Sequence, residues 1–413
     1  MPDTSIAVIG AGIVGASVAL ALQRDGNRVT LLERKEPCAG ASFGNAGAIV
    51  NACCIPTAMP GAAINALRML SNPKSPLSIK PAYFHSILPW LMRFVYESRS
   101  SRVNKNARDL YAITHRANAA WRRLTNDTDL SRLLHQRGWL KVYGSERSFA
   151  STKEARALMD EIGTPYDVLN AADIEDIEPQ LAPIYQRGLL QGDSLHIHNP
   201  QRMVEGMVDL LVSRGGSFAS FNVRAISIDG DSVCLQDSEN VLSFQKVVIA
   251  AGAWSGALAK QLGDKLPLEA ERGYHLMLPR SNNNLLSRSV VNADRGFVLV
   301  PMETGLRLTS QVEFASLDAP PDYRHIRGLL PAASRMLPGL DASEESVWMG
   351  PRPSLPDSLP VLGFAARSEN VLYAFGHQHL GMTLGPLTGQ IIADLVANRD
   401  PGIDLKPYSP RRY

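Results

Sequence analysis

The sequence predicts an α/β protein in which a domain with a parallel sheet is interrupted by an inserted α+β domain carrying a large mixed or antiparallel sheet. Three observations predict this fold class. A strand–helix–strand pattern opens the chain, a second β-branched run ending in glycine returns at 246–252, and the remaining residues mix helical and alternating patterns. We expect residues 1–80, 199–265 and 345–413 to form the first domain, and residues 81–198 and 266–344 to form the inserted domain.

The composition is that of a folded protein with more than one core. Of the 413 residues, 45% are hydrophobic and 20% are charged, which excludes a disordered chain. The 42 basic and 40 acidic side chains leave a formal charge of +2, too small to favour a nucleic-acid partner. The 4 cysteines include no C-x-x-C pair, which favours a reducing compartment.

Local patterns predict the first βαβ unit. Ser5–Ile9 is a short β-branched run, Ile13–Arg24 has the small and aliphatic residues of a helix, and Arg28–Leu32 has the pattern of a second strand. The uncharged stretch 6–22 is too short for a membrane span, follows no basic residue and contains three glycines. We therefore interpret it as part of this unit and not as a membrane span or a signal segment.

The rest of the chain alternates helical and strand patterns after a loop at 37–66. Periodicity predicts helices at 109–126, 154–163, 201–214 and 385–397. Alternation and β-branched runs predict strands at 139–143, 188–197, 218–228, 233–235, 246–250 and 371–375, and further strands within 267–315. A proline-rich loop is expected at 351–360. The aromatic segment 83–95 is interpreted either as a buried helix pair or as a surface anchor.

A glycine-rich motif, Gly10-Ala11-Gly12-Ile13-Val14-Gly15, lies between the first strand and the first helix. Gly10 allows a tight turn, Gly12 lets the backbone approach a pyrophosphate, and Gly15 lets the helix pack close to the strand. Glu33 ends the second strand, where a carboxylate accepts hydrogen bonds from an adenosine ribose and repels a 2′-phosphate. The motif predicts a dinucleotide site and argues against NADP; a glycine-rich turn without a ligand is the alternative.

Several further segments resemble the D-amino-acid oxidase and glycine oxidase superfamily of flavoproteins. They are Arg34 with Ser42-Phe43-Gly44-Asn45-Ala46-Gly47, then Val247–Ser255, Trp348–Asp357 with Pro360 and Gly363, and Gly376-His377 with Leu380-Gly381. These matches span both ends and the middle, so the resemblance covers essentially the whole chain. Within the superfamily, residues 42–47, 76–81 and 272–274 are most similar to the D-amino-acid dehydrogenases, and an enzyme of D-hydroxyproline is the second option.

The resemblance implies FAD, bound in a Rossmann-like domain of the GR2 type. The binding is expected to be non-covalent, because the position at which some sarcosine-oxidising relatives carry a flavin-tethering cysteine falls here in Val347-Trp348-Met349. The residues expected around the cofactor are Gly10, Gly12, Ile13, Val14, Gly15, Glu33, Arg34, Ser42, Asn45, Ala46, Gly47, Val223, Ala251, Gly252, Trp254, Gly376, Leu380, Gly381 and Met382.

The resemblance also implies hydride transfer from the substrate Cα to flavin N5, which needs alignment more than a protein base. Arg352 matches the carboxylate-binding arginine of the family and is our first candidate; a structural arginine that bridges loop carbonyls is the alternative. Tyr274 is a candidate second donor to the substrate carboxylate or a core residue. His377 fits the Gly-His pattern of a loop at the flavin edge, and His379 either lines the pocket or faces water.

No metal is expected. His196 and His198 lie one residue apart on a predicted strand and point to the same face, a spacing that suggests a metal site. No third ligand lies nearby in the sequence, so we interpret both as packing residues.

The sequence therefore predicts an enzyme that oxidises the CH–NH bond of a D-amino acid, with D-proline and cis-4-hydroxy-D-proline among the candidates, to an imino acid that hydrolyses to a 2-oxo acid and ammonia. Two alternatives stay open: a glycine or sarcosine type of oxidase that uses oxygen, and a flavin-bearing electron-relay subunit of a hetero-oligomer. The expected partners are an amino acid and a quinone or another electron acceptor. The expected location is the cytoplasm, with segment 83–95 as a candidate contact with the inner face of the membrane. The substrate and the oligomeric state are left open.

Overall fold

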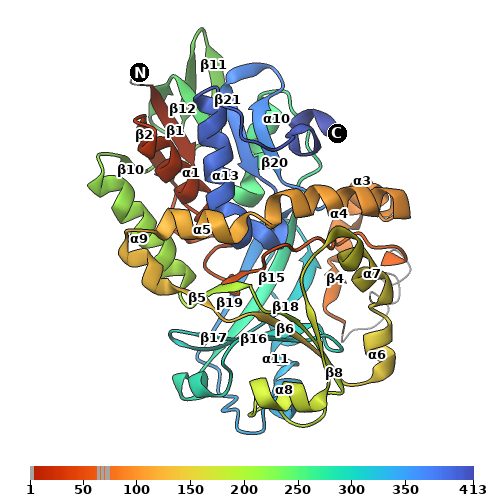
Figure 1. Cartoon of the computed structure of the whole chain (residues 1–413). Helices are drawn as coiled ribbons and strands as arrows, with labels where there is room; N and C mark the ends of the chain where they lie inside the picture. Colours follow the sequence, from red (N-terminus) through yellow and green to blue (C-terminus); the bar gives the residue numbers. More distant parts are fainter. Residues whose placement is uncertain (1–3, 63–65, 67–68, 70–74) are drawn as a thin grey trace.

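Two sheets dominate the computed structural model, which describes residues 4–62, 66, 69 and 75–413. The upper half of Figure 1 holds a six-stranded sheet with its helices, and the lower half holds a nine-stranded mixed sheet. Each sheet gathers segments from distant parts of the chain. This agrees with the prediction of an α/β protein that carries a second, mixed sheet.

The six-stranded sheet consists of β1 (Ser5–Ile9), β2 (Arg28–Glu33), β10 (Ser217–Ser220), β14 (Lys246–Ile249), β20 (Val361–Ala365) and β21 (Ser368–Phe375). Its order is β10-β2-β1-β14-β21-β20, and only β20 runs antiparallel to its neighbour. The apolar side chains of β1 and β14 are buried on both faces, as β-branched runs in a parallel sheet should be. The predicted βαβ unit and the late return of a strand beside β1 are both confirmed.

The two faces of this sheet are covered differently. On one face lie α1 (Ile13–Arg24), α9 (Pro200–Ser213) and α13 (Gly381–Val396), whose apolar residues share a core with the inner strands. On the other face lie α10 (Ser255–Gln261) and a three-stranded sheet of β11 (Ala225–Asp229), β12 (Ser232–Gln236) and β13 (Val241–Phe244). Helices α1 and α13 pack closely at Gly389, which has no side chain. A Cβ there would lie 2.5 Å from the Ser17 carbonyl oxygen. Figure 1 shows them side by side.

The nine-stranded sheet consists of β4 (Leu77–Ile79), β6 (Trp139–Tyr143), β7 (Asp167–Leu169), β8 (Arg187–Gln191), β15 (Glu269–Leu278), β16 (Ser289–Asn292), β17 (Phe297–Met302), β18 (Gly305–Phe314) and β19 (Ser346–Ser354). Its main path is β19-β15-β18-β17-β16-β6-β8-β7, with β4 paired to β18. Side chains alternate between its faces. One face, with Leu140, Leu276 and Leu308, buries a second core, and the other faces the parallel sheet.

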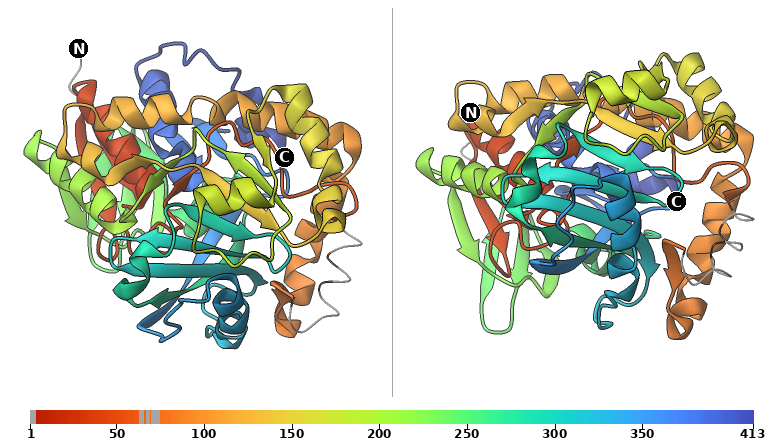
Figure 2. Two further views of the ribbon diagram at one scale, coloured as in Figure 1. Left: turned by 60° about the horizontal axis from the view of Figure 1, so that its bottom comes forward. Right: turned by 90° about the horizontal axis from the view of Figure 1, so that it is seen from below.

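The remaining helices are α3 (Phe84–Glu97), α4 (Ser100–Thr114), α5 (Ala117–Thr125), α6 (Glu146–Ala150), α7 (Lys153–Ile162), α8 (Ala171–Ile177), α11 (Arg324–Arg327) and α12 (Leu330–Met336). A small sheet of β3 (Ala48–Ile49), β9 (Leu195–Ile197) and β5 (Leu134–Gln136) joins the two halves. Figure 2 shows the helices of residues 84–125 running along one side of the molecule.

Several predicted elements were wrong in their extent. Residues 188–197, predicted as one strand, form β8 and β9 in two different sheets because Gly192-Asp193-Ser194 makes a turn. Residues 218–228 likewise divide into β10 and β11, the predicted helix 109–126 breaks between α4 and α5, and α13 begins about one turn before residue 385. Residues 351–354, predicted as loop, belong to β19. Prolines are tolerated there because β19 is an edge strand that pairs only with β15.

The predicted domain boundaries do not coincide with sheet membership. Strands β4 and β19, which lie outside the predicted inserted domain, join the nine-stranded sheet. Helix α5, which lies inside it, packs through Trp121 against the core of α1 and α13. The division into two domains stays a prediction. Each predicted domain contributes strands or a helix to the sheet or core of the other.

Segment 83–95 forms most of one helix, α3, and not a buried helix pair. Ile87 and Trp90 are buried against Phe314, whereas Phe84, Leu88, Met92, Val95 and Tyr96 are exposed. Within the part of the chain that the structure describes, every helix is too short or too polar to cross a bilayer.

Candidate active site

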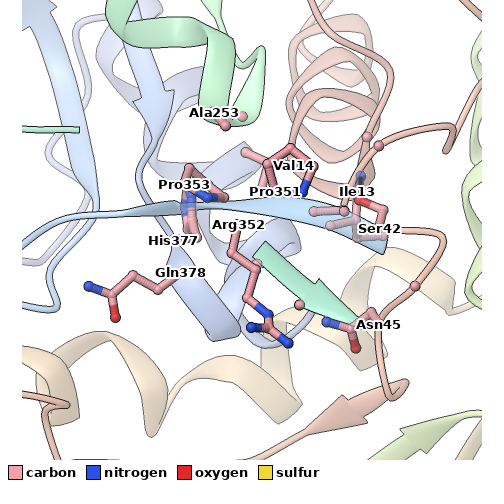
Figure 3. Close-up of a pocket in the computed structure, with 18 of the residues that line it drawn as sticks. Ile13, Val14, Ser42, Asn45, Ala253, Pro351, Arg352, Pro353, His377 and Gln378 are labelled. Atoms are coloured by element: carbon pink, nitrogen blue, oxygen red, sulfur yellow. Dashed lines mark hydrogen bonds between the residues drawn. The ribbon is translucent and has the colours of Figure 1, made fainter. Parts of the chain in front are cut away.

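A cavity of about 900 Å³ lies between the parallel sheet and the nine-stranded sheet. The carboxyl ends of β1, β2 and β14, the first turns of α1 and α13, strand β19 and the inner face of the nine-stranded sheet all contribute to its wall. Ligands of open α/β sheets bind at this end of the strands. Figure 3 shows Arg352 and His377 reaching into the same space as Ile13, Val14 and Ser42.

The glycine motif forms the turn that its spacing predicts. Gly10 has a φ of +104°, and a Cβ there would lie 2.6 Å from the Ala250 carbonyl oxygen. A Cβ on Gly15 would lie 1.8 Å from the Gly10 carbonyl oxygen, so only glycine lets α1 rest on β1. Gly12 is the N-cap of α1 and carries no side chain over the helix end. The start of the helix, Gly12 to Val14, lines the cavity, which fits a pyrophosphate.

Glu33 stands at the end of β2 and lines the cavity. Its Oε2 accepts a hydrogen bond from Ala11 N at 2.9 Å, and its Oε1 accepts from Arg34 N at 2.9 Å. The carboxylate thus ties the glycine turn to the next strand. Oε1 also accepts from Lys35 N at 3.2 Å, whereas Oε2 keeps a further lone pair, which fits a hydroxyl of a ribose.

An aromatic and basic wall follows Glu33. The Arg34 guanidinium lies 3.8 Å above the ring of Trp254, and Val223, Ala251 and Gly252 line the cavity beside them. A planar guanidinium over an indole is a stable pair, and such a wall fits a purine ring.

The segment Ser42–Gly47 is held from two sides. Ser42 Oγ accepts a hydrogen bond from Ile13 N at 3.0 Å, which fastens the segment to the start of α1. Buried Arg307 donates through Nη1 to Phe43 O at 3.0 Å and to Asn45 O at 2.5 Å, which fastens it to β18. Burial lowers the pKa of Arg307 to about 10, so it stays a cation at neutral pH. No local motif marks Arg307, because its partners lie more than 260 residues away.

Residues 376–382 form the opposite rim of the cavity. His377 Nε2 lies 2.9 Å from Thr388 Oγ1, and burial lowers the pKa of His377 to about 3, so the imidazole is neutral. The short helix η5 (Gln378–Leu380) leads into α13, and Leu380, Gly381 and Met382 line the cavity. A helix N-terminus here favours negative charge in the cavity.

Arg352 lies on β19, and its guanidinium extends over the backbone of the neighbouring strand. A Cβ at Gly273 would lie 2.0 Å from Arg352 Nη2, so the glycine of β15 makes room for it. Nη1 donates to Glu271 Oε1 and to Gln311 O, both at 3.1 Å. Among the described residues, Nε and Nη2 have no hydrogen-bond partner, and they remain available to a carboxylate in the cavity.

Glu271 organises the residues around Arg352. Its carboxylate is 4% exposed and also meets His379 Nε2 at 2.8 Å and Ser354 Oγ at 3.2 Å. Burial raises the pKa of Glu271, but the hydrogen bond and charge of His379, together with Arg352 and Ser354, outweigh burial and hold it at about 2. A permanent anion therefore fixes one side of the guanidinium and leaves the other side free.

Tyr274 is placed differently from a carboxylate ligand. Its ring belongs to the second core, on the face of the sheet that points away from the parallel sheet. Its hydroxyl donates to Glu313 Oε2 at 2.5 Å, and burial raises its pKa. This arrangement favours the interpretation of Tyr274 as a core residue, which reaches the cavity wall beside Gly273.

The family model for FAD dependent oxidoreductases matches residues 5–395. The chain belongs to this family. A D-amino-acid oxidase of Bradyrhizobium diazoefficiens is 32% identical over the full length of both chains, and a D-amino acid dehydrogenase of Rhizobium johnstonii is 27% identical over 99% of both. The crystal structure of glycine oxidase from Geobacillus kaustophilus shares the fold, with a TM-score of 0.75, 22% identity and coverage of 99% of both chains.

As a member of this family the chain is an FAD-dependent oxidoreductase. The glycine turn with α1, the Glu33 carboxylate, the Arg34–Trp254 wall and the start of α13 would hold the pyrophosphate, the ribose, the adenine and the ring system of FAD. Of the residues predicted around FAD, all but Gly15, Gly47 and Gly376 line the cavity. Those three shape the backbone: Gly47 and Gly376 have φ of +66° and +84° and are hemmed in by Ile197 O and Leu355.

Several lining residues of this oxidoreductase were not predicted. They include Trp348, whose ring stacks on that of His275 and lies against Gly44. They also include Lys141, Gln191 and Gln311, which lie on the nine-stranded sheet. Trp348 lay within the family motif and could have been found from it. For Lys141, Gln191 and Gln311, alternation along the strand shows which residues share a face of the sheet. Nothing in the sequence says which of the two faces meets the cavity.

His196 and His198 lie close together, with His135 as a third ring. The ring centroids of His198 lie 4.3 Å from His135 and 4.8 Å from His196, and His196 Nε2 lies 3.1 Å from Pro301 O. Burial lowers the pKa of His196 to about 3. Across the described residues, no group of three or more His, Cys, Asp or Glu side chains has a metal-binding arrangement.

Proposed function

We propose that this enzyme oxidises the CH–NH bond of a D-amino acid, giving an imino acid that hydrolyses to a 2-oxo acid and ammonia, or that remains an imine when the substrate is cyclic. The single observation that carries the proposal is the half-free guanidinium of Arg352 in a cavity that also contains the dinucleotide cradle. The D-amino-acid oxidase and dehydrogenase named among its relatives support the choice of enantiomer.

The chemistry that FAD supplies when bound is acceptance of two electrons, so the substrate Cα needs a position and not a strong base. Arg352 binds the α-carboxylate through Nε and Nη2, and Glu271 with Gln311 O prevents the guanidinium from rotating. His377 is neutral and hydrogen-bonded to Thr388, which gives it a role in holding the rim and not in taking a proton. The first turn of α13 stabilises negative charge that develops beside it.

The substrate is identified by a panel with an artificial electron acceptor. D- and L-alanine, D-proline, cis-4-hydroxy-D-proline, glycine and sarcosine are compared with and without oxygen. We expect turnover of D-amino acids at least about tenfold faster than of their L enantiomers. Turnover of glycine or sarcosine alone, with oxygen as the acceptor, would instead establish the oxidase alternative. Purified chain that reduces the acceptor with none of them would favour the electron-relay alternative.

We further propose that the electrons pass to a quinone and that the enzyme rests on the inner face of the cytoplasmic membrane through α3. The exposed apolar side chains Phe84, Leu88, Met92 and Val95 recur at the spacing of one helix face, and Met92 is 60% exposed. Such a face inserts into the boundary between headgroups and acyl chains.

Pelleting with vesicles tests the membrane contact. We expect the wild type to sediment with vesicles that contain anionic lipids, and the double variant Leu88→Glu/Met92→Glu to stay in the supernatant because two carboxylates oppose insertion. Val241→Glu is the matched control, since Val241 is 62% exposed on β13, away from α3. Equal supernatant fractions with and without vesicles would exclude the contact.

A further inference from the structure

The inner face of the nine-stranded sheet carries polar side chains at the end of the cavity away from β19. Trp139, Lys141 and Gln191 all line the cavity. Trp139 is opposite Gln191 in the β6–β8 register, and Lys141 is opposite Leu189, so Lys141 and Gln191 are diagonal neighbours on one face. The alternate residues Leu140 and Val142 point into the second core.

Among the residues that the structure describes, Lys141 has no compensating charge. Among the described residues, its ammonium group makes no ion pair and no hydrogen bond, although the side chain is partly buried. Arg352, the cation of the cavity wall near β19, has a partner in Glu271. Cys53 lines the cavity as well, but burial raises the pKa of its thiol, so it is neutral and cannot serve as the counter-ion. A cation enclosed without a partner is unfavourable unless a ligand supplies the negative charge.

Two buried amides line the cavity, Gln191 beside Lys141 and Gln311 beside Arg352. Gln191 is 5% exposed, and no side-chain hydrogen bond joins it to another described residue. Gln311 is 7% exposed, its Oε1 has no hydrogen-bond partner, and its φ is +78°. A non-glycine residue in the left-handed region is strained, and strain of this kind gathers at ligand sites. Gln311 O also accepts the hydrogen bond from Arg352 Nη1, which connects the two ends of the cavity.

The spacing of the strands sets the length of ligand that both ends can hold. The Arg352 guanidinium lies over Gly273 of β15 and reaches Gln311 O of β18. Strand β6 is the third strand beyond β18, about 14 Å away at a spacing of about 4.7–4.9 Å per strand. Because the Arg352 guanidinium already reaches β18, only the Lys141 side chain shortens this span further. The remaining distance suits an amino acid with a carboxylate at the end of an extended side chain. Alanine is too short to span it.

We propose that Lys141, with Gln191, forms a subsite for the side-chain carboxylate of acidic D-amino acids of the length of D-glutamate. The proposal rests on the proposed function, in which Arg352 holds the α-carboxylate. The two carboxylates of the substrate then meet two separated cations, and the Gln191 amide donates a hydrogen bond to the distal carboxylate.

The test compares kcat/KM for D-glutamate, D-glutamine, D-leucine and D-alanine in the wild type and in Lys141→Met. We expect the wild type to prefer D-glutamate to D-leucine by about tenfold or more. Methionine keeps the length of the side chain without its charge, so Lys141→Met should lower the ratio of D-glutamate to D-alanine by about 10- to 100-fold. Lys153→Met, which removes an exposed lysine of α7, is the control and should keep the wild-type ratio. A wild type that prefers D-leucine, or a ratio unchanged in Lys141→Met, would overturn the proposal.

Binding without turnover separates this proposal from the proposed function. Glutarate and valerate have the same chain length but differ by one carboxylate, and their dissociation constants can be read from the change in the flavin absorbance spectrum. We expect glutarate to bind at least about tenfold more tightly than valerate in the wild type and to lose that advantage in Lys141→Met. If this holds while no D-amino acid is oxidised, the subsite stands and the proposed function fails. If D-alanine is oxidised while glutarate and valerate bind alike, the proposed function stands and the subsite fails.

Discussion

Replacing Arg352 with methionine is expected to lower kcat/KM for D-amino acids by about 10²–10³-fold while the purified protein keeps its FAD. The guanidinium offers Nε and Nη2 to the substrate, and removing a charged, enclosed hydrogen-bonding partner costs about 3–4 kcal/mol of transition-state binding. FAD content should persist because Glu271, the neighbour left behind, still pairs with His379 and Ser354. The measurement is steady-state kinetics together with the flavin-to-protein ratio of each preparation.

Two further variants define what the Arg352 result means. Arg352→Lys keeps the charge but not the planar fork, so we expect its kcat/KM to lie between the values of the wild type and of Arg352→Met. Arg132→Met removes an arginine whose side chain is 83% exposed and should leave kinetics and FAD content alone. Wild-type turnover in Arg352→Met would show that the guanidinium is a structural bridge between strands, and would favour the electron-relay interpretation.

Replacing Gly15 with alanine is expected to remove FAD from the protein. The added Cβ would lie 1.8 Å from the Gly10 carbonyl oxygen, so α1 must move off β1 and carry its amide groups away from the cavity. We expect a flavin-to-protein ratio below about a tenth of the wild-type value and a destabilisation of about 3 kcal/mol, seen as a lower melting temperature.

Gly192→Ala is the matched control for Gly15→Ala. No atom lies within 4 Å of a Cβ built at Gly192, which sits in the turn between β8 and β9. This variant should keep FAD and melt close to the wild type. Full FAD content in Gly15→Ala would mean that α1 does not carry the cofactor in the way that we infer from the turn.

The cofactor half of the site was predictable because its signals are local. Three glycines, a strand, a helix and Glu33 lie within the first 33 residues, so their spacing can be recognised along the sequence. The β-branched run before Gly252 could likewise be assigned to the same sheet, because buried parallel strands carry a recognisable composition. The family resemblance added the segments 42–47 and 376–382, which no periodicity would have placed at the cavity.

The substrate half was less predictable because it depends on pairing between distant strands. Glu271 holds Arg352 across 81 residues, and Arg307 holds the Ser42–Gly47 segment across more than 260. The prolines of β19 predict a loop from the sequence. They are tolerated in this strand because it lies at an edge of the sheet. Tyr274 shows the limit of motif transfer: by alternation along β15 it shares a face with Leu276 and Leu278, so its ring points into the second core and its hydroxyl meets Glu313.

The most direct test of the whole account is the spectrum of the purified protein under anaerobic conditions. We predict that the protein carries about one FAD per chain, released intact by heat, and that a D-amino acid bleaches its absorbance near 450 nm, as expected for a flavin, while the L enantiomer leaves it unchanged. Protein that is colourless and takes up no added FAD, or flavin that no D-amino acid bleaches, would contradict the account.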